Sequence, residues 1–287
     1  MDWDRDLSGW SLPELSRRIV NGPHRWHVQV AGNGPDLLLL PGAGASTHSW
    51  RALMPELAKS YRVIALDLPG QGFTQSPNAK RSGLEETAED ITALAKAEGW
   101  SPTAIIGHSA GAAIALRLSQ TLGTPKVVGI NPALDNFEGV AGWLFPILAR
   151  LMAATPFTAS LFTFGASPAR ARRLIEGTGS KLDDEGLRYY TRLTADREHV
   201  NGALQMMAHW SLDALLRDLP DIDAEVLFLT GANDTAVPPR VAEEAAARLP
   251  HARVAKLYGL GHLAHEEEPR RVLDAIRPFL QSSKTAE

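Results

Sequence analysis

The chain has 287 residues, of which 44% are hydrophobic and 22% are charged, and its formal net charge is −4. These values fit one large or two small globular domains, and the absence of a basic excess argues against a nucleic-acid-binding protein because phosphates would go unneutralised. The sequence contains no cysteine, which excludes a disulfide framework, a thiolate nucleophile and a cysteine-ligated metal.

The first residues, MDWDRDLSGW, are acidic and lack the basic and apolar regions of a secretory signal. The most apolar stretch, 140–149, contains Pro146 and is too short to span a bilayer. We therefore expect a cytoplasmic protein without a transmembrane segment. A peripheral contact with a membrane through apolar residues in the middle of the chain stays open.

Strand and helix patterns alternate through the first 134 residues. Residues 24–31 alternate in polarity and predict an antiparallel edge strand. Four further strands, with apolar runs that predict burial on both faces, are expected at 36–40, 61–66, 103–107 and 126–130. Helical spacing lies between them at 49–60, 84–98 and 110–122. The alternation predicts a mostly parallel, doubly wound α/β sheet with helices on both faces.

This rhythm breaks between residues 135 and 219, where the patterns are helical. It resumes with strands expected at 225–230 and 253–258 and helices at 241–249 and 269–281. We therefore predict a core domain of residues 1–134 and 220–287 with a helical insertion at 135–219. An insertion at the carboxyl edge of such a sheet would cap the crevice where ligands bind.

The strongest local motif is Gly107-His108-Ser109-Ala110-Gly111, which matches the G-x-S-x-G pattern of a nucleophile elbow. It follows an expected strand and opens an expected helix, which is the context that the motif requires. Small flanking residues let the two backbones approach while the turn lifts the serine hydroxyl clear of the sheet. Ser109 is the candidate nucleophile, and an ordinary serine in a glycine-lined turn is the alternative.

A serine nucleophile needs a base, and the base needs an acid to orient it. His262 follows the last strand behind a glycine pair and is the candidate base, with His265 as its competitor. Asp234, in the loop after the strand EVLFLT, is the candidate acid, and Asp135, after the strand KVVGI, is the alternative. The order serine, acid, histidine is that of α/β-hydrolases.

Acyl transfer also needs two backbone N–H donors for the developing oxyanion. We expect them from Ala110, directly after the nucleophile, and from Ala43 in the glycine-rich loop after DLLLL, for which a plain tight turn is the alternative. The candidate substrate-pocket residues are Gly42, His108, Trp143, Met206, Met207 and Trp210. The aromatic and methionine side chains among them equally fit the core of a cap. No metal or cofactor motif is found, so none is predicted.

Further characteristic segments accompany the elbow and the base loop at 25–29, 44–51, 67–70, 174–180 and 202–208. Together they resemble the α/β-hydrolase superfamily and, more narrowly, the BchO-type proteins of bacteriochlorophyll biosynthesis, which are described as magnesium chelatase accessory proteins. The two segments from the insertion carry most weight, because caps differ widely between hydrolase families. The chain departs from the superfamily at Pro41 and Gln71, where histidine is frequent; the first change leaves the backbone donors in place.

The resemblance implies a hydrolase of esters or acyl groups that acts near the magnesium chelatase step, using Ser109, Asp234 and His262. It further implies an apolar or tetrapyrrole substrate, no cofactor, and magnesium chelatase subunits as candidate partners. Two alternatives stay open, a non-catalytic accessory protein that binds a porphyrin or the chelatase, and a general carboxylesterase.

Overall fold

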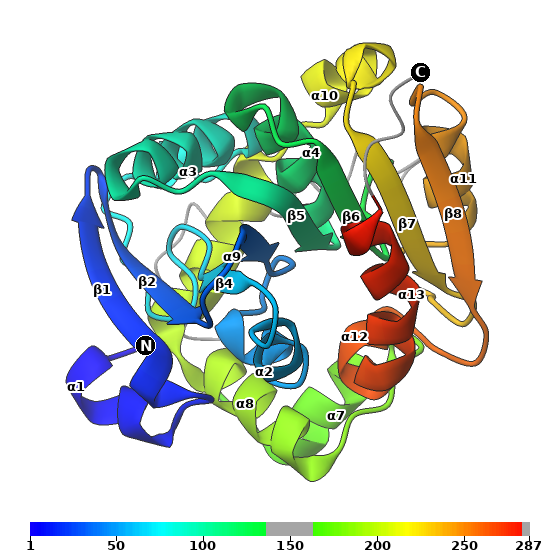
Figure 1. Cartoon of the computed structure of the whole chain (residues 1–287). Coiled ribbons are helices and arrows are strands. Elements are labelled where there is room, and N and C mark those ends of the chain that lie inside the picture. Colours follow the sequence, from blue (N-terminus) through cyan, green and yellow to red (C-terminus); the bar gives the residue numbers. More distant parts are fainter. Residues whose placement is uncertain (136–162, 283–287) are drawn as a thin grey trace.

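The described residues, 1–135 and 163–282 of a computed structural model, contain an eight-stranded sheet in the order β1-β2-β4-β3-β5-β6-β7-β8 (Figure 1). The strands are β1 Ser16–Asn21, β2 His24–Ala31, β3 Asp36–Leu40, β4 Arg62–Leu66, β5 Pro102–His108, β6 Lys126–Ile130, β7 Glu225–Gly231 and β8 Ala252–Leu257. β2 pairs antiparallel with β1 and β4, and all other neighbours are parallel. The predicted mostly parallel sheet is confirmed.

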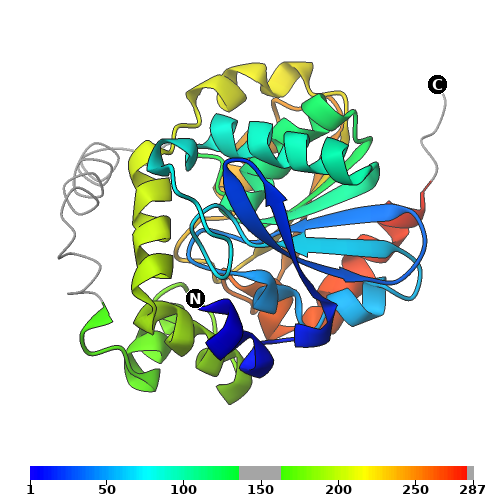
Figure 2. The ribbon, with the colours of Figure 1, turned by 90° about the vertical axis from the view of Figure 1, so that its left-hand side faces the viewer.

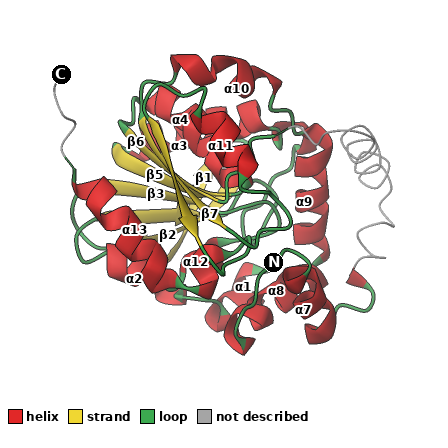
Figure 3. Cartoon of the chain, turned by 90° about the vertical axis from the view of Figure 1, so that its right-hand side faces the viewer, coloured by secondary structure: helices red, strands yellow, loops and turns green. Residues whose placement is uncertain are grey.

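Helices cover both faces of the sheet. They are α1 Trp3–Asp6, α2 Met54–Leu57, α3 Leu84–Glu98, α4 Ala110–Leu122, α7 Pro168–Glu176, α8 Asp184–Ala195, α9 Arg197–His209, α10 Asp213–Asp218, α11 Arg240–Ala246, α12 Ala264–Glu267 and α13 Pro269–Gln281. In Figure 2, α9 stands as an upright yellow-green helix beside the sheet, with α7 and α8 below it. In Figure 3, α3, α4 and α11 lie on one side of the strands and α2, α12 and α13 on the other.

The central strands are apolar on both faces because each face packs on helices. In β3, Leu38 and Leu40 belong to the core shared with α3, α4 and α11. Leu37 and Leu39 belong to the core shared with α2 and α13. Since successive side chains of a strand point to opposite faces, a strand between two helical layers needs a continuous apolar run, and DLLLL supplies it.

Two predicted elements differ from the structure. Residues 24–31 form β2, but β2 is not an edge strand, because β1 pairs along its outer side. The sequence of β1, SRRIVN, has exposed arginines at the sheet edge and therefore lacks an apolar signature. The helix expected at 49–60 is split into a 3₁₀ turn, Thr47–Trp50, and the short α2. Pro55 lies in the first turn of α2, where its missing N–H costs no hydrogen bond.

Helices α7 to α10 lie between β6 and β7 in the chain, within the predicted insertion. α9 contacts the loops that follow β3 and β4, since His199 hydrogen-bonds to Gly72 and Gly44. These contacts put α9 at the carboxyl edge of the sheet. The assignment of 135–219 as a cap stays a prediction. Among the described helices, none has the length and apolarity needed to cross a membrane.

Candidate active site

Ser109 lies in a strained turn between β5 and α4. Its φ of 52° and ψ of −118° are outside the regions that side-chain-bearing residues favour. A Cβ on Gly107 would lie 2.2 Å from the carbonyl oxygen of Gly111, and one on Gly111 would lie 2.3 Å from that of Leu40. The two glycines are therefore required for the strand, the helix and the neighbouring β3 to approach. Such strain is characteristic of functional turns.

Asp234 and His262 form a hydrogen-bonded pair near this turn, since the carbonyl oxygen of His262 accepts from His108, the residue before Ser109. The Nδ1–H of His262 donates to Oδ2 of Asp234 at 2.7 Å. The other carboxylate oxygen of Asp234 accepts from the N–H groups of Ala236 and Val237, both at 2.8 Å. Because a carboxylate only accepts, the pair fixes the proton of the neutral imidazole on Nδ1 and leaves the lone pair on Nε2. The Asp234 side chain is fully buried, whereas that of His262 is slightly exposed.

Asn131 completes this pair, although no sequence motif indicated its role. Its Nδ2 donates to Oδ2 of Asp234 at 2.7 Å and to the carbonyl oxygen of Gly261 at 3.3 Å. It directly follows β6 and has a φ of 46°, a value that asparagine tolerates better than most residues. Asn131 thus holds the acid loop and the base loop together.

The competing candidates lie elsewhere. Asp135 contacts the guanidinium of Arg240 at 3.5 Å. His265 is completely buried, its ring packs between Trp50 and His108, and neither ring nitrogen has a hydrogen-bond partner among the described residues. Burial, with the nearby charges of Arg51 and His262, lowers the pKa of His265 to about 3. His265 is therefore a neutral core residue at physiological pH.

The loop that carries Ala43 is held by Gln71. The N–H of Gly44 donates to Oε1 of Gln71 at 2.6 Å, and Nε2 of Gln71 donates to Sδ of Met206 at 3.2 Å. The N–H groups of Ala43 and Ala110 have no hydrogen-bond partner within residues 1–135 and 163–282. Ala110 belongs to the core cluster that contains Met206, and Ala43 is partly buried against it. Two unused backbone donors next to a nucleophile elbow are what an oxyanion hole requires.

The remaining pocket candidates are distributed around this centre. His108 is buried, and its Nε2–H donates to the carbonyl oxygen of His262 at 2.9 Å. Burial, together with His265 and His262 nearby, lowers the pKa of His108 well below its ordinary value. A Cβ on Gly42 would lie 2.8 Å from Nδ1 of His108. Of the α9 region, Met206 is buried and Trp210 is partly buried against the same core.

Met207, also on α9, is half-buried, and Trp143 lies outside the described residues.

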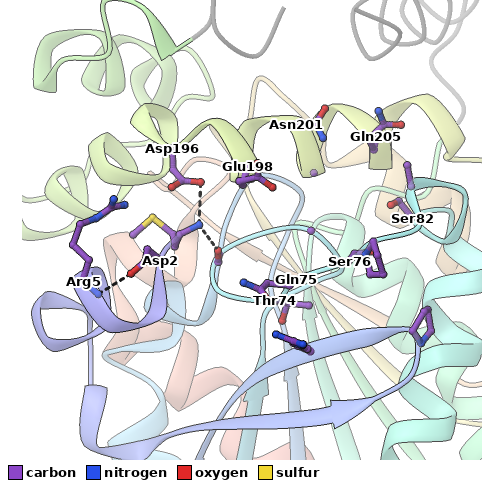
Figure 4. Close-up of a pocket in the computed structure, with 18 residues that line it drawn as sticks. Asp2, Arg5, Thr74, Gln75, Ser76, Ser82, Asp196, Glu198, Asn201 and Gln205 are labelled. Atoms are coloured by element: carbon purple, nitrogen blue, oxygen red, sulfur yellow. Dashed lines mark hydrogen bonds and ion pairs between the residues drawn. The ribbon is translucent and has the colours of Figure 1, made fainter. Parts of the chain in front are cut away.

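A polar cavity of about 610 Å³ lies beside the Gly70–Gly72 turn, separate from the candidate triad (Figure 4). Its lining includes Thr74, Gln75, Glu198 and Asn201 but none of Ser109, Asp234 and His262. The N-terminal ammonium group donates to Asp196 at 3.0 Å at one end of it. Within the part of the chain that the structure describes, no group of three or more histidine, aspartate or glutamate side chains could hold a metal ion.

The fold and this geometry define an α/β-hydrolase, and the chain belongs to that family: the family model described as alpha/beta hydrolase fold matches residues 35–269. The chain is 48% identical over 262 residues to the magnesium-chelatase 30 kDa subunit of Rhodobacter capsulatus, which covers 90% of this chain and 92% of that protein. The predicted fold class and the resemblance to the BchO-type proteins are confirmed by these matches.

Two further comparisons concern esterases. The chain is 27% identical over 265 residues to a pimeloyl-[acyl-carrier protein] methyl ester esterase of Xanthomonas oryzae pv. oryzae, with 89% of this chain and 99% of that protein covered. A thermophilic esterase from Thermogutta terrifontis superposes with a TM-score of 0.75 at 23% identity, covering 93% of this chain and 98% of that one. The structural likeness supports the fold alone.

Proposed function

We propose that the chain is a serine hydrolase of carboxylic esters that acts near the magnesium chelatase step of bacteriochlorophyll biosynthesis. The observation that carries the proposal is the 2.7 Å hydrogen bond between His262 and Asp234. His262 lies near the strained turn at Ser109, because its carbonyl oxygen accepts from the ring of His108 at 2.9 Å. The relative from Rhodobacter capsulatus, named as a magnesium-chelatase subunit, supports the pathway. An apolar or tetrapyrrole ester is the proposed substrate class.

In the proposed mechanism, Oγ of Ser109 attacks the ester carbonyl carbon while Nε2 of His262 takes the hydroxyl proton. Asp234 keeps the imidazole in the required tautomer and stabilises the imidazolium. The N–H groups of Ala43 and Ala110 bind the oxyanion. The imidazolium then protonates the leaving alcohol, and water, deprotonated by the same imidazole, hydrolyses the acyl-enzyme to release the acid.

A serine-reactive phosphonate probe tests the nucleophile directly. We expect stoichiometric labelling of the wild-type chain, with the adduct mapped by mass spectrometry to Ser109, and no labelling of Ser109→Ala. Ser119→Ala is the matched control, because Ser119 lies in α4 and its hydroxyl, within the described part of the chain, donates to the carbonyl oxygen of Leu116. It should label like the wild type. An unlabelled wild type, or an adduct on another residue, would overturn the assignment.

A second candidate function is a non-catalytic accessory role, which the name of the Rhodobacter capsulatus relative favours. The same preparation distinguishes it from catalysis. Tight protoporphyrin or chelatase binding by a chain that the phosphonate does not label would support the accessory role. Turnover of short acyl esters without porphyrin affinity would instead support a general carboxylesterase, the activity class to which the Xanthomonas oryzae relative belongs by name.

A further inference from the structure

A four-residue segment between α7 and α8, residues 177–180, hydrogen-bonds to both the acid loop and the base loop. We call it the 177–180 bridge. On the acid side, the side chain of Thr235 donates to the carbonyl oxygen of Gly177 at 2.9 Å. On the base side, the N–H of Leu263 donates to Oγ of Ser180 at 2.8 Å. The bridge therefore contacts the residues that directly follow Asp234 and His262.

The carbonyl oxygen of Thr178 joins the two loops at one atom. It accepts from the N–H of Thr235 at 3.3 Å and from the N–H of His262 at 3.4 Å. A carbonyl oxygen has two lone pairs, so both bonds can form together. Any displacement of this oxygen changes the position of the acid loop and of the base backbone at the same time.

The bridge is packed against the two loops without spare volume. Gly179 has a φ of +82°, and a Cβ there would lie 1.9 Å from the carbonyl oxygen of Asn233. A Cβ on Gly261 would lie 2.3 Å from the carbonyl carbon of Gly179. Backbone therefore meets backbone on both sides. Glycine at 179 and at 261 is the only residue that permits this approach.

Ser180 is the side chain through which the bridge acts on the base loop. It is completely buried, and its Oγ is the acceptor for the Leu263 N–H, which is also buried. Removing Oγ would leave that N–H without a partner, a cost that a buried loop relieves by moving. The nearest group to move with it is His262, one residue away.

We propose that the 177–180 bridge is a positioning element that sets the geometry of the Asp234–His262 pair, with Ser180 as its positioning residue. The proposal rests on the proposed function, because it assigns to His262 the role of base. It goes beyond that function by placing part of the catalytic geometry under the control of the segment that links α7 to α8. An insertion that only covered a substrate would not need hydrogen bonds to both loops.

The test compares Ser180→Ala with Ser167→Ala in the full chain. Ser167 caps α7, where its side chain accepts from the N–H of Arg170, so each variant removes one acceptor from the same inserted region. For Ser180→Ala we expect kcat on an activated ester to fall about tenfold or more with KM nearly unchanged, since the base is displaced but the binding surface is intact. Ser167→Ala should keep the wild-type kcat.

A second readout does not depend on turnover. A strongly hydrogen-bonded imidazole N–H gives a downfield proton resonance, and the signal of the His262–Asp234 bond is identified by its loss in His262→Gln. We expect the signal to broaden or shift in Ser180→Ala and to stay unchanged in Ser167→Ala. An unchanged signal and an unchanged kcat in Ser180→Ala would overturn the bridge proposal, as would equal losses in both variants.

These outcomes are separable from failure of the proposed function. If the wild type shows no phosphonate labelling and no ester turnover, the hydrolase proposal fails, while the resonance still reports whether the bridge positions the pair. If the wild type is active and Ser180→Ala keeps its kcat and its signal, the hydrolase proposal stands and the bridge proposal fails.

Discussion

The side chain of Asn131 contacts the acid of the candidate triad directly. Its amide donates to the carboxylate of Asp234, which also accepts a hydrogen bond from Nδ1–H of His262. In Asn131→Asp, a second carboxylate would lie at about the position of this amide and face Asp234 across a distance close to the present 2.7 Å. Two carboxylates this close cannot both stay charged without cost, and a shared proton would compete with His262. We expect labelling by the phosphonate to slow by roughly 10–100-fold at neutral pH.

Asn131→Asp keeps the size of the side chain and the tolerance of a positive φ, so the turn should be preserved. Asn233→Asp is the control, since Asn233 lies in the same loop as Asp234 but is exposed, and only its backbone carbonyl oxygen takes part in the fit with Gly179. It should label at nearly the wild-type rate. Wild-type labelling by Asn131→Asp would show that the amide does not help to orient the acid.

The sequence supports the prediction of site residues that carry a local signature. Ser109 has the elbow motif, and Asp234 and His262 follow strands where such loops are expected. Asn131 and Ser180 have no signature of this kind. Asn131 meets Asp234 across 103 residues of sequence, and Ser180 meets Leu263 across 83. Their contacts depend on how the strand order and the insertion bring distant loops together, which no short motif encodes.

At the scale of elements, α9 is linked to the loops after β3 and β4 by the imidazole of His199. The N–H of Gly72 donates to Nδ1 of His199 at 2.9 Å, so Nε2 carries the proton and donates to the carbonyl oxygen of Gly44 at 3.2 Å. His199→Ala removes both bonds, so the loop that contains Ala43 keeps its bond to Gln71 but loses its link to α9. We expect kcat to fall by roughly 10-fold or more with correct folding retained, because an oxyanion donor that is not held in place stabilises the transition state less. Single-turnover acylation measures this step.

His209→Ala is the matched control for this prediction, since His209 lies at the exposed end of the same helix and its ring, among the described residues, hydrogen-bonds to the carbonyl oxygen of Gln205. Equal kcat values in the two variants would contradict a link between α9 and the oxyanion loop. A rise in KM with an unchanged kcat would also contradict it, because the loop would then act on binding rather than on the transition state.

Elements were predictable where one physical requirement determined the sequence. After their first residue, β3 and β4 are apolar because helices cover both faces, so they are recognised without knowledge of the neighbouring elements. β1 was missed because an edge strand with one exposed side can carry Arg17 and Arg18. The helix expected at 49–60 is not continuous in the structure. The spacing of apolar residues did not reveal that a separate helix begins there, with Pro55 in its first turn.

At the scale of the whole molecule, the core contains several histidines that stay neutral. Burial, followed by the charges of Arg51 and His262, lowers the pKa of His265 to about 3. Burial and the N-terminal ammonium group lower the pKa of His199 to about 4. Burial likewise lowers the pKa of His48 and of His108 well below the ordinary value of 6.5. Each of these groups takes up a proton more readily in the unfolded chain than in the folded one.

The sign of the pH dependence follows from this difference. Between about pH 6.5 and pH 4 the unfolded chain binds more protons at these histidines, so the free energy of unfolding decreases as the pH falls. For His265 and His199 the lowered pKa values correspond to a loss of about 3 kcal/mol each by about pH 4. Burial raises the pKa of Glu266, so this group makes the free energy of unfolding increase as the pH falls. Because the histidines and Glu266 have opposite effects, a variant that lacks one histidine shows its contribution more clearly than the wild type alone.

His265→Phe isolates one of these contributions. It keeps an aromatic ring between Trp50 and His108 and removes two ring nitrogens that have no hydrogen-bond partner among the described residues. In urea denaturation, we expect the variant to be at least as stable as the wild type at about pH 7, and to lose about 3 kcal/mol less on going to about pH 4. His209→Phe, at an exposed position, should follow the wild type at both pH values. If the wild type and His265→Phe lost equal free energy of unfolding between the two pH values, His265 would not stay neutral in the folded chain. Its burial would then not contribute to acid unfolding.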